Sequence, residues 1–163
     1  MTDSAFRVRQ AEPDDAPAIA RIWYDGWQEA HRGRVPDELV AVRTRETFDE
    51  RAVDHVRDSS VAELAGAVAG FVMIIGDEVE QVYVAPGGRG IGVADALLAE
   101  AERRVAAAGH DRAWLAVVAG NARARRFYER NGWVDEGEFD HQAPGPNGPI
   151  SVPAHRYAKS LTT

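Results

Sequence analysis

Two periods of hydrophobicity alternate along the chain, and together they predict a protein built from both strands and helices. Apolar runs, or an apolar–polar alternation of period two, predict strands at 6–9, 61–64, 68–75, 78–84, 114–118, 133–139 and 152–159. Apolar residues three or four positions apart predict helices from Asp15 through Trp27 to a break at 32–36, and then at 37–57, 93–108 and 122–131. This order predicts a mixed sheet covered by helices.

Turn residues separate these elements clearly. Residues 65–67 join two of the strands, so a hairpin is expected there. Gly109 and Gly132 stand where a glycine commonly ends a helix. A proline- and glycine-rich loop, 143–149, separates the last two strands. With 163 residues and neither a repeat nor a linker, we expect a single domain over 1–163.

Composition narrows the chemistry. The absence of cysteine excludes disulfides, thiolate ligands and a cysteine nucleophile, and the five histidines lack a zinc-binding spacing, so no metal is expected. A net charge of −7 argues against nucleic acid or an anionic membrane as a partner. The first ten residues lack the apolar core of a signal peptide, and the longest apolar stretch, 65–76, is too short to span a bilayer. We expect a soluble, cytoplasmic protein.

A glycine-rich segment between a predicted strand and a predicted helix, 82–94, has the form of an anion site. Glycines let backbone N–H groups approach a phosphate, and the helix N-terminus adds partial positive charge. The segment contains no lysine, so it is not a P-loop, and Asp95 stands where a dinucleotide fingerprint needs its third glycine. A glycine-rich turn without a ligand remains the alternative.

Two motifs in this order resemble the GNAT superfamily of acyl-CoA-dependent N-acyltransferases. The first is Arg89-x-x-Gly92-x-Ala94, and the second runs from Asn121 through Ala124, Phe127, Tyr128 and Gly132 to Trp133. The resemblance extends over nearly the whole chain, although the motifs are confined to 78–133. It implies an α/β (α+β) fold with a mixed, mostly antiparallel central sheet flanked by helices.

The resemblance also implies how acetyl-CoA would bind. Backbone groups around Val82 and Val84 would hold the pantetheine arm as an added strand, and Asn121 would contact the same arm. The pyrophosphate would meet Arg89 and the N–H groups of Gly90, Ile91, Gly92, Val93 and Ala94. Tyr128 would lie near the thioester sulfur.

Without a cysteine, direct attack of an amine on the thioester is the simplest mechanism. The attacking amine needs a base, and Glu78 occupies the strand position that carries the base in some family members. Glu80, on the same face, and an ordered water remain alternatives. Tyr128 is the candidate acid for the departing thiolate, and the N–H of Val84 the candidate oxyanion donor. A solvated Glu78 and a tyrosine merely packed beside Phe127 are the structural alternatives.

The acceptor is expected to be the primary amine of a small molecule or an amino-acid-like compound. Tyr24, Trp27 and His31 share one helical face in the region that borders the acceptor pocket in the family, although core aromatics with an exposed histidine would give the same pattern. Arginines 123, 125 and 126 are interpreted as a solvated helix face, with contact to the nucleotide 3′-phosphate as the alternative. A non-catalytic acyl-CoA-binding module and acetylation of a protein amine are the alternative functions. Homodimers are common in the family, but no residue here demonstrates one.

Overall fold

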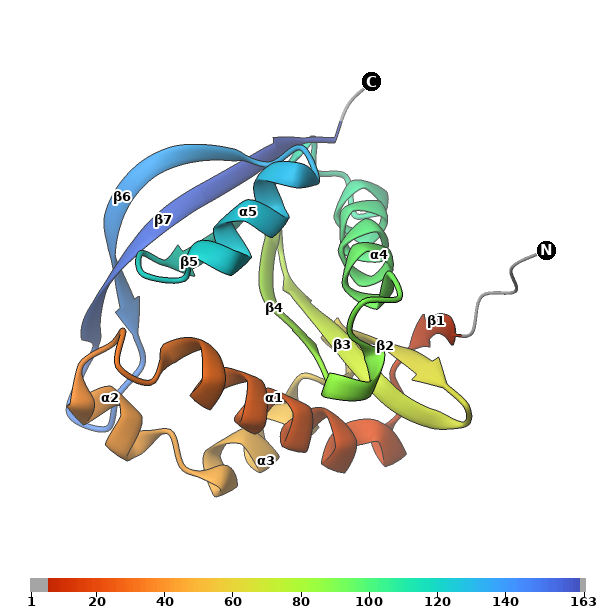
Figure 1. Ribbon diagram of the computed structural model, residues 1–163, viewed down its shortest axis with the longest axis horizontal. Helices are drawn as coiled ribbons and strands as arrows, with labels where there is room; N and C mark the ends of the chain where they lie inside the picture. Colours follow the sequence, from red (N-terminus) through yellow and green to blue (C-terminus); the bar gives the residue numbers. More distant parts are fainter. Residues whose placement is uncertain (1–5, 162–163) are drawn as a thin grey trace.

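A twisted sheet with helices on both faces forms the framework of the computed structural model, which describes residues 6–161 (Figure 1). Within that range the strands form one seven-stranded sheet in the order β1-β2-β3-β4-β5-β7-β6. Only β4 and β5 run parallel among these neighbours. The strands are β1 Phe6–Gln10, β2 Ser59–Leu64, β3 Ala67–Ile75, β4 Glu78–Val84, β5 Arg112–Val118, β6 Val134–Ala143 and β7 Ile150–Ser160.

The helices divide between the two faces of this sheet (Figure 1). On one face lie α1 Ala16–His31, α2 Asp37–Val42 and α3 Arg45–Asp54, and on the other lie α4 Val93–Ala107 and α5 Ala122–Arg130. Short 3₁₀ turns occur at Pro13–Asp15, Val56–Asp58 and Pro86–Gly88. In the described part of the chain, no helix is long and apolar enough to cross a membrane.

Side chains of the central strands alternate between two hydrophobic cores. Phe71 points to the core under α1 and α3, where Trp23 meets Phe48 edge-on at 5.3 Å between ring centroids. Its neighbour Val72 points to the core under α4, beside Leu97. A strand buried on both faces shows a continuous apolar run in sequence, as β3 does. The mixed, mostly antiparallel sheet flanked by helices is thereby confirmed.

Two elements differ from the sequence-based expectation. The predicted helix 37–57 is three pieces, because the chain turns extended at Thr44, whose carbonyl then accepts the first N–H groups of α3. The predicted strand 133–139 continues to Ala143, because it pairs with β7 on both sides of an irregularity at 136–137, and only 144–149 remain for the loop. Trp133 precedes the strand and is buried in the core under α4.

Candidate active site

The parallel strands β4 and β5 meet at one end and separate at the other. Glu78 and Trp114 are the one pair in register between them, and the Trp114 N–H donates to the carbonyl of Asp77 at 3.1 Å. Beyond this pair, β4 bonds to β3 and β5 bonds to β7. The edges of β4 and β5 that face each other are therefore free of strand pairing toward their C-terminal ends.

The free edge of β4 presents the backbone of Val82 and Val84. Ala85 donates its N–H to Ala69 at 2.8 Å, so odd-numbered residues at this end of β4 bond to β3. Because successive residues of a strand point their N–H and C=O groups to opposite edges, those of Val82 and Val84 point into the gap. An extended ligand could hydrogen-bond there as an added strand.

A glycine loop follows β4 and opens α4. Gly90 and Gly92 have φ angles of 80° and 89°, a left-handed conformation that side chains disfavour, and a Cβ at either would meet open space. The N–H groups of residues 90–95 donate to no acceptor within 6–161. Together with the start of a fifteen-residue helix, they suit an anion such as a pyrophosphate.

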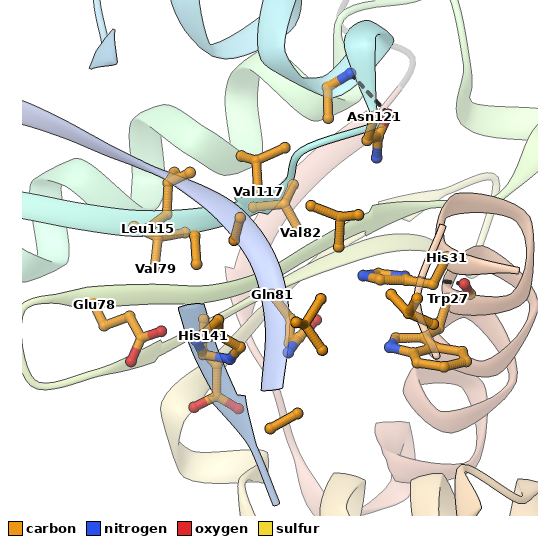
Figure 2. Close-up of a pocket in the computed structure, with 18 of the residues that line it drawn as sticks. Trp27, His31, Glu78, Val79, Gln81, Val82, Leu115, Val117, Asn121 and His141 are labelled. Carbon is orange, nitrogen blue, oxygen red and sulfur yellow. Dashed lines mark hydrogen bonds between the residues drawn. The ribbon is translucent and has the colours of Figure 1, made fainter. Parts of the chain in front are cut away.

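Helix α5 brings Asn121 and Tyr128 to the same gap. The Asn121 side-chain oxygen accepts the N–H of Ala124 at 3.2 Å and caps the helix, which leaves its amide NH₂ to donate (Figure 2). The Tyr128 hydroxyl has no hydrogen-bond partner among residues 6–161. Burial raises the pKa of Tyr128, so the hydroxyl remains a proton donor at neutral pH.

A pocket of about 350 Å³ continues from the gap toward α1 and the end of β6. Of the residues predicted from sequence, it is lined by Glu78, Val82, Asn121, Tyr128, Trp27 and His31. Figure 2 shows Glu78 at one end of the pocket and Trp27, His31 and Asn121 at the other. The structure thus brings together residues separated by up to a hundred positions in sequence.

Glu78 has the protonation properties of a general base. Burial, with smaller contributions from the negative charges of Glu80 and Asp77, raises the pKa of Glu78 to about 7. No cation lies within ion-pair distance of its carboxylate in the described part of the chain, and the more distant positive charge of Arg156 offsets only part of the rise. A carboxylate with a pKa near neutrality can both accept and release a proton under physiological conditions.

Glu80 differs from Glu78 although both line the pocket. A bulge in β4 lies at Glu80, because β3 pairs on one side of it with Val79 and on the other with Gln81. Its carboxylate accepts from Arg51 Nη2 at 2.9 Å. The same guanidinium lies 4.5 Å from the centroid of the Trp23 ring. Glu80 is therefore held in a structural ion pair.

Trp27 and His31 form a stacked pair on the α1 side of the pocket. Their ring centroids are 4.7 Å apart with 12° between the planes. The Nδ1 of His31 lies 3.0 Å from the Trp27 carbonyl, which can only accept, so Nδ1 carries the proton. Burial lowers the pKa of His31 to about 4, so the ring is neutral at pH 7.

Other predicted residues lie outside the pocket. The glycine loop and Val84 lie at the open end of the gap, and Arg89 donates to both carboxylate oxygens of Glu29 on α1, at 3.2 and 2.9 Å. Tyr24 packs edge-on against Phe48, with centroids 5.7 Å apart, and does not line the pocket.

The interpretation of Arg125 as part of a solvated helix face is wrong. It donates to the Tyr157 hydroxyl at 3.1 Å and to Asp135 at 3.2 Å, because α5 packs its inner face on β6 and β7. Among the pocket-lining residues that sequence reasoning missed are Arg43, Arg51 and His141. Arginines are frequent in 37–57, and no local pattern marks which of them turn inward.

In the part of the chain described, no three His, Asp or Glu side chains form a group that could hold a metal ion.

Comparisons with known proteins agree with this geometry. Residues 18–133 match the sequence model of the acetyltransferase (GNAT) family. An uncharacterized N-acetyltransferase of Mycobacterium tuberculosis is 36% identical over 95 residues, which are 55% of this chain and 61% of that relative. The match thus spans less than two thirds of the curated relative's length.

Solved structures show the same fold at lower identity. The GCN5-related N-acetyltransferase of Rhodopseudomonas palustris has a TM-score of 0.74 at 22% identity, with 98% of each chain covered. The PaiA N-acetyltransferase of Thermoplasma acidophilum, solved in complex with coenzyme A, has a TM-score of 0.70 at 18% identity, covering 98% of this chain and 99% of that one.

Proposed function

Because this chain belongs to the acetyltransferase (GNAT) family, we propose that it transfers the acetyl group of acetyl-CoA to the primary amine of a small molecule. The observation that carries the proposal is the separation of β4 and β5 beyond Glu78 and Trp114. It leaves a free strand edge beside a pocket with a titratable carboxylate, and a glycine loop with free N–H groups follows the same strand.

The residues present suit acetyl-CoA at this place. Val82 and Val84 would bond the pantetheine arm, Asn121 would donate to it, and the N–H groups of Gly90, Ile91, Gly92, Val93 and Ala94 would hold the pyrophosphate. The coenzyme A in the related Thermoplasma structure supports this choice of co-substrate. When bound, acetyl-CoA supplies an acyl group activated as a thioester.

The chain's own residues would then move two protons. Glu78 takes a proton from the incoming ammonium through a chain of waters, because Val84 lies six residues further along β4, about 20 Å away, and the nitrogen lone pair attacks the acetyl carbon. The N–H of Val84 stabilises the negative charge that develops on the carbonyl oxygen. As the carbon–sulfur bond breaks, Tyr128 gives its proton to the sulfur, and it regains a proton through solvent as the new amide loses its second proton; Glu78 releases the first proton to solvent.

The function is tested by two measurements on the same protein. At a hundredfold excess over Kd, acetyl-CoA should add about 2.7 kcal/mol to the free energy of unfolding, or roughly 5–10 °C in Tm. Release of free thiol on addition of an amine should follow, read with a thiol reagent that meets no cysteine in the protein. A Tm shift without thiol release from any amine would favour a non-catalytic binding module. No shift at millimolar acetyl-CoA would contradict the proposal.

A further inference from the structure

The charged side chains that line the pocket do not all have partners. Arg51 and Glu80 neutralise each other at 2.9 Å. The two histidines of the pocket, His31 and His141, add no charge at neutral pH, because burial lowers the pKa of each. Arg43 is the remaining cation of the lining, and no carboxylate of residues 6–161 lies within 4.0 Å of it.

Arg43 is held in place by a single hydrogen bond. It follows the last residue of α2, is half-buried, and donates from Nη2 to the carbonyl of Pro144 at 2.7 Å, across the mouth of the β6–β7 loop. A guanidinium has five N–H donors, so most of the donors of this pocket-lining side chain have no partner among residues 6–161. Burial lowers the pKa of Arg43, which reflects the cost of holding this charge without an anion.

The surroundings of Arg43 strengthen its positive field. The adjacent lining is apolar, with Val35, Leu39 and Ala143, and provides no counter-charge. The positive charge of Arg43 contributes to lowering the pKa of His31, so its field extends across the pocket. The protein as a whole carries a net charge of −7. A cationic site inside an acidic protein is complementary to an anionic group on a ligand.

We propose that Arg43 binds the carboxylate of the acceptor, so that the acceptor is a compact amino acid with a free carboxyl group. This inference rests on the proposed function. The planar fork of a guanidinium matches the two oxygens of a carboxylate. A pocket of about 350 Å³ lies near the small end of ligand sites, and it suits one amino acid beside the acetyl group.

The test compares acceptors that carry a carboxylate with partners that lack its charge. The enzyme, loaded with acetyl-CoA, is given glycine, other α-amino acids, β-alanine and γ-aminobutyrate. Each acceptor is compared with its amide and with the amine that lacks the carboxyl group, and the free thiol released is measured. The carboxylates should have kcat/KM values roughly 10- to 100-fold above those of the neutral partners. The glycine to γ-aminobutyrate series then reports the separation between Arg43 and the acetyl group.

Two variants locate the effect. Arg43→Gln, which retains an N–H donor for Pro144, should raise KM for the carboxylate acceptor roughly 10- to 100-fold and remove the preference over the amide. KM for acetyl-CoA and the Tm shift that it causes should not change, which shows that the variant is folded. Arg45→Gln is the matched control, because Arg45 lies two residues away, exposed and paired with Asp49; its acceptor KM should equal that of the wild type.

The assignment would be overturned by equal use of carboxylates and amides by the wild type, by an unchanged acceptor KM in Arg43→Gln, or by a preference for O-phosphoethanolamine over every amino acid. Thiol release with peptides or simple amines but with no amino acid would also overturn it, while the proposed function would stand. Loss of both acetyl-CoA binding and thiol release with every amine would instead contradict the proposed function.

Discussion

The site has two parts that are built in different ways: a loop end, which is the gap between β4 and β5 with the glycine loop, and an acceptor end, which is the side-chain pocket beside it. The loop end consists of backbone groups from two continuous segments, β4 with the start of α4, and the start of α5. The acceptor end is lined by side chains from four distant places: Trp27 and His31, Arg43, Arg51, and His141. A backbone site fits a ligand part that never changes, whereas a side-chain site can be altered one residue at a time. The first end therefore suits acetyl-CoA and the second suits the acceptor.

This division predicts which kinetic constant each substitution changes. Substitutions at the loop end should change KM for acetyl-CoA, and substitutions of the side chains at the acceptor end should change KM for the amine. Substitutions of Glu78 and Tyr128, which move the protons, should change kcat.

The largest effect is expected at Glu78. Glu78→Gln should lower kcat by about 10²- to 10³-fold, because the amine loses its base. In the wild type, activity should rise with pH and level off above about pH 7, where Glu78 is deprotonated. In the variant this rise of kcat up to pH 7 should be absent. Only the rise that deprotonation of the amine itself causes, at higher pH, should remain. A full kcat profile between pH 5 and 9 measures both.

Two comparisons sharpen this result. Glu80→Gln should keep this rise of kcat and move it to lower pH, because the negative charge of Glu80 contributes to raising the pKa of Glu78 and its loss leaves Arg51 unpaired. A variant that loses the rise would transfer the base role to Glu80. The folded pKa of Glu78 is raised above 4.5, so the native state binds the proton more tightly and its stability falls as pH rises from about 4.5 to about 7. Glu78→Gln should accordingly have a higher Tm than the wild type at pH 8 and an equal one near pH 4.

A smaller effect is expected at Tyr128. Tyr128→Phe should lower kcat roughly tenfold to a hundredfold, because a thiolate is a good leaving group and needs little help from an acid. Its Kd for acetyl-CoA, measured by calorimetry, should remain within about twofold. Tyr24→Phe removes the same atom from a ring that packs on Phe48 outside the pocket, and it should change neither constant. Wild-type kcat in Tyr128→Phe would exclude the acid role.

The glycine loop is expected to act on acetyl-CoA alone. Gly92→Ala places a Cβ on a backbone with φ of 89°, so the loop should relax and KM for acetyl-CoA should rise roughly tenfold. Gly87→Ala is the matched control, because Gly87 has an ordinary φ and open space around its Cα. A larger change in amine KM than in acetyl-CoA KM would contradict the division of the pocket.

The same division explains what the sequence could predict. The strand–glycine–helix segment 82–94 and the α5 motif are contiguous, and their function depends on backbone geometry that local sequence specifies. Their elements were predicted with small errors at the boundaries, and the mixed, mostly antiparallel sheet was predicted correctly. Burial on both faces left a direct record in the continuous apolar run of β3.

The acceptor end left no such record. Arg43 and Arg51 lie among other arginines in 37–57, and only the break at Thr44 and the packing of α3 on α1 turn these two into the pocket. His141 faces the pocket because β6 extends beyond its predicted end and pairs with β7. Side chains that meet through tertiary packing between distant segments have no common period or spacing in the sequence, so pattern analysis cannot find them.

The smallest expected effect concerns Arg89, which the sequence assigns to the phosphates and the structure pairs with Glu29. If Arg89 contacts the pyrophosphate, it must leave Glu29, and that carboxylate also repels the ligand. Glu29→Gln should then lower Kd for acetyl-CoA about two- to fivefold, and the gain should disappear in the Glu29→Gln, Arg89→Gln double variant. Because the pair is partly exposed, Tm should hardly change. Weaker binding in Glu29→Gln would instead show that the ion pair holds the loop against α1, so that a side chain, and not the backbone alone, shapes the acetyl-CoA end.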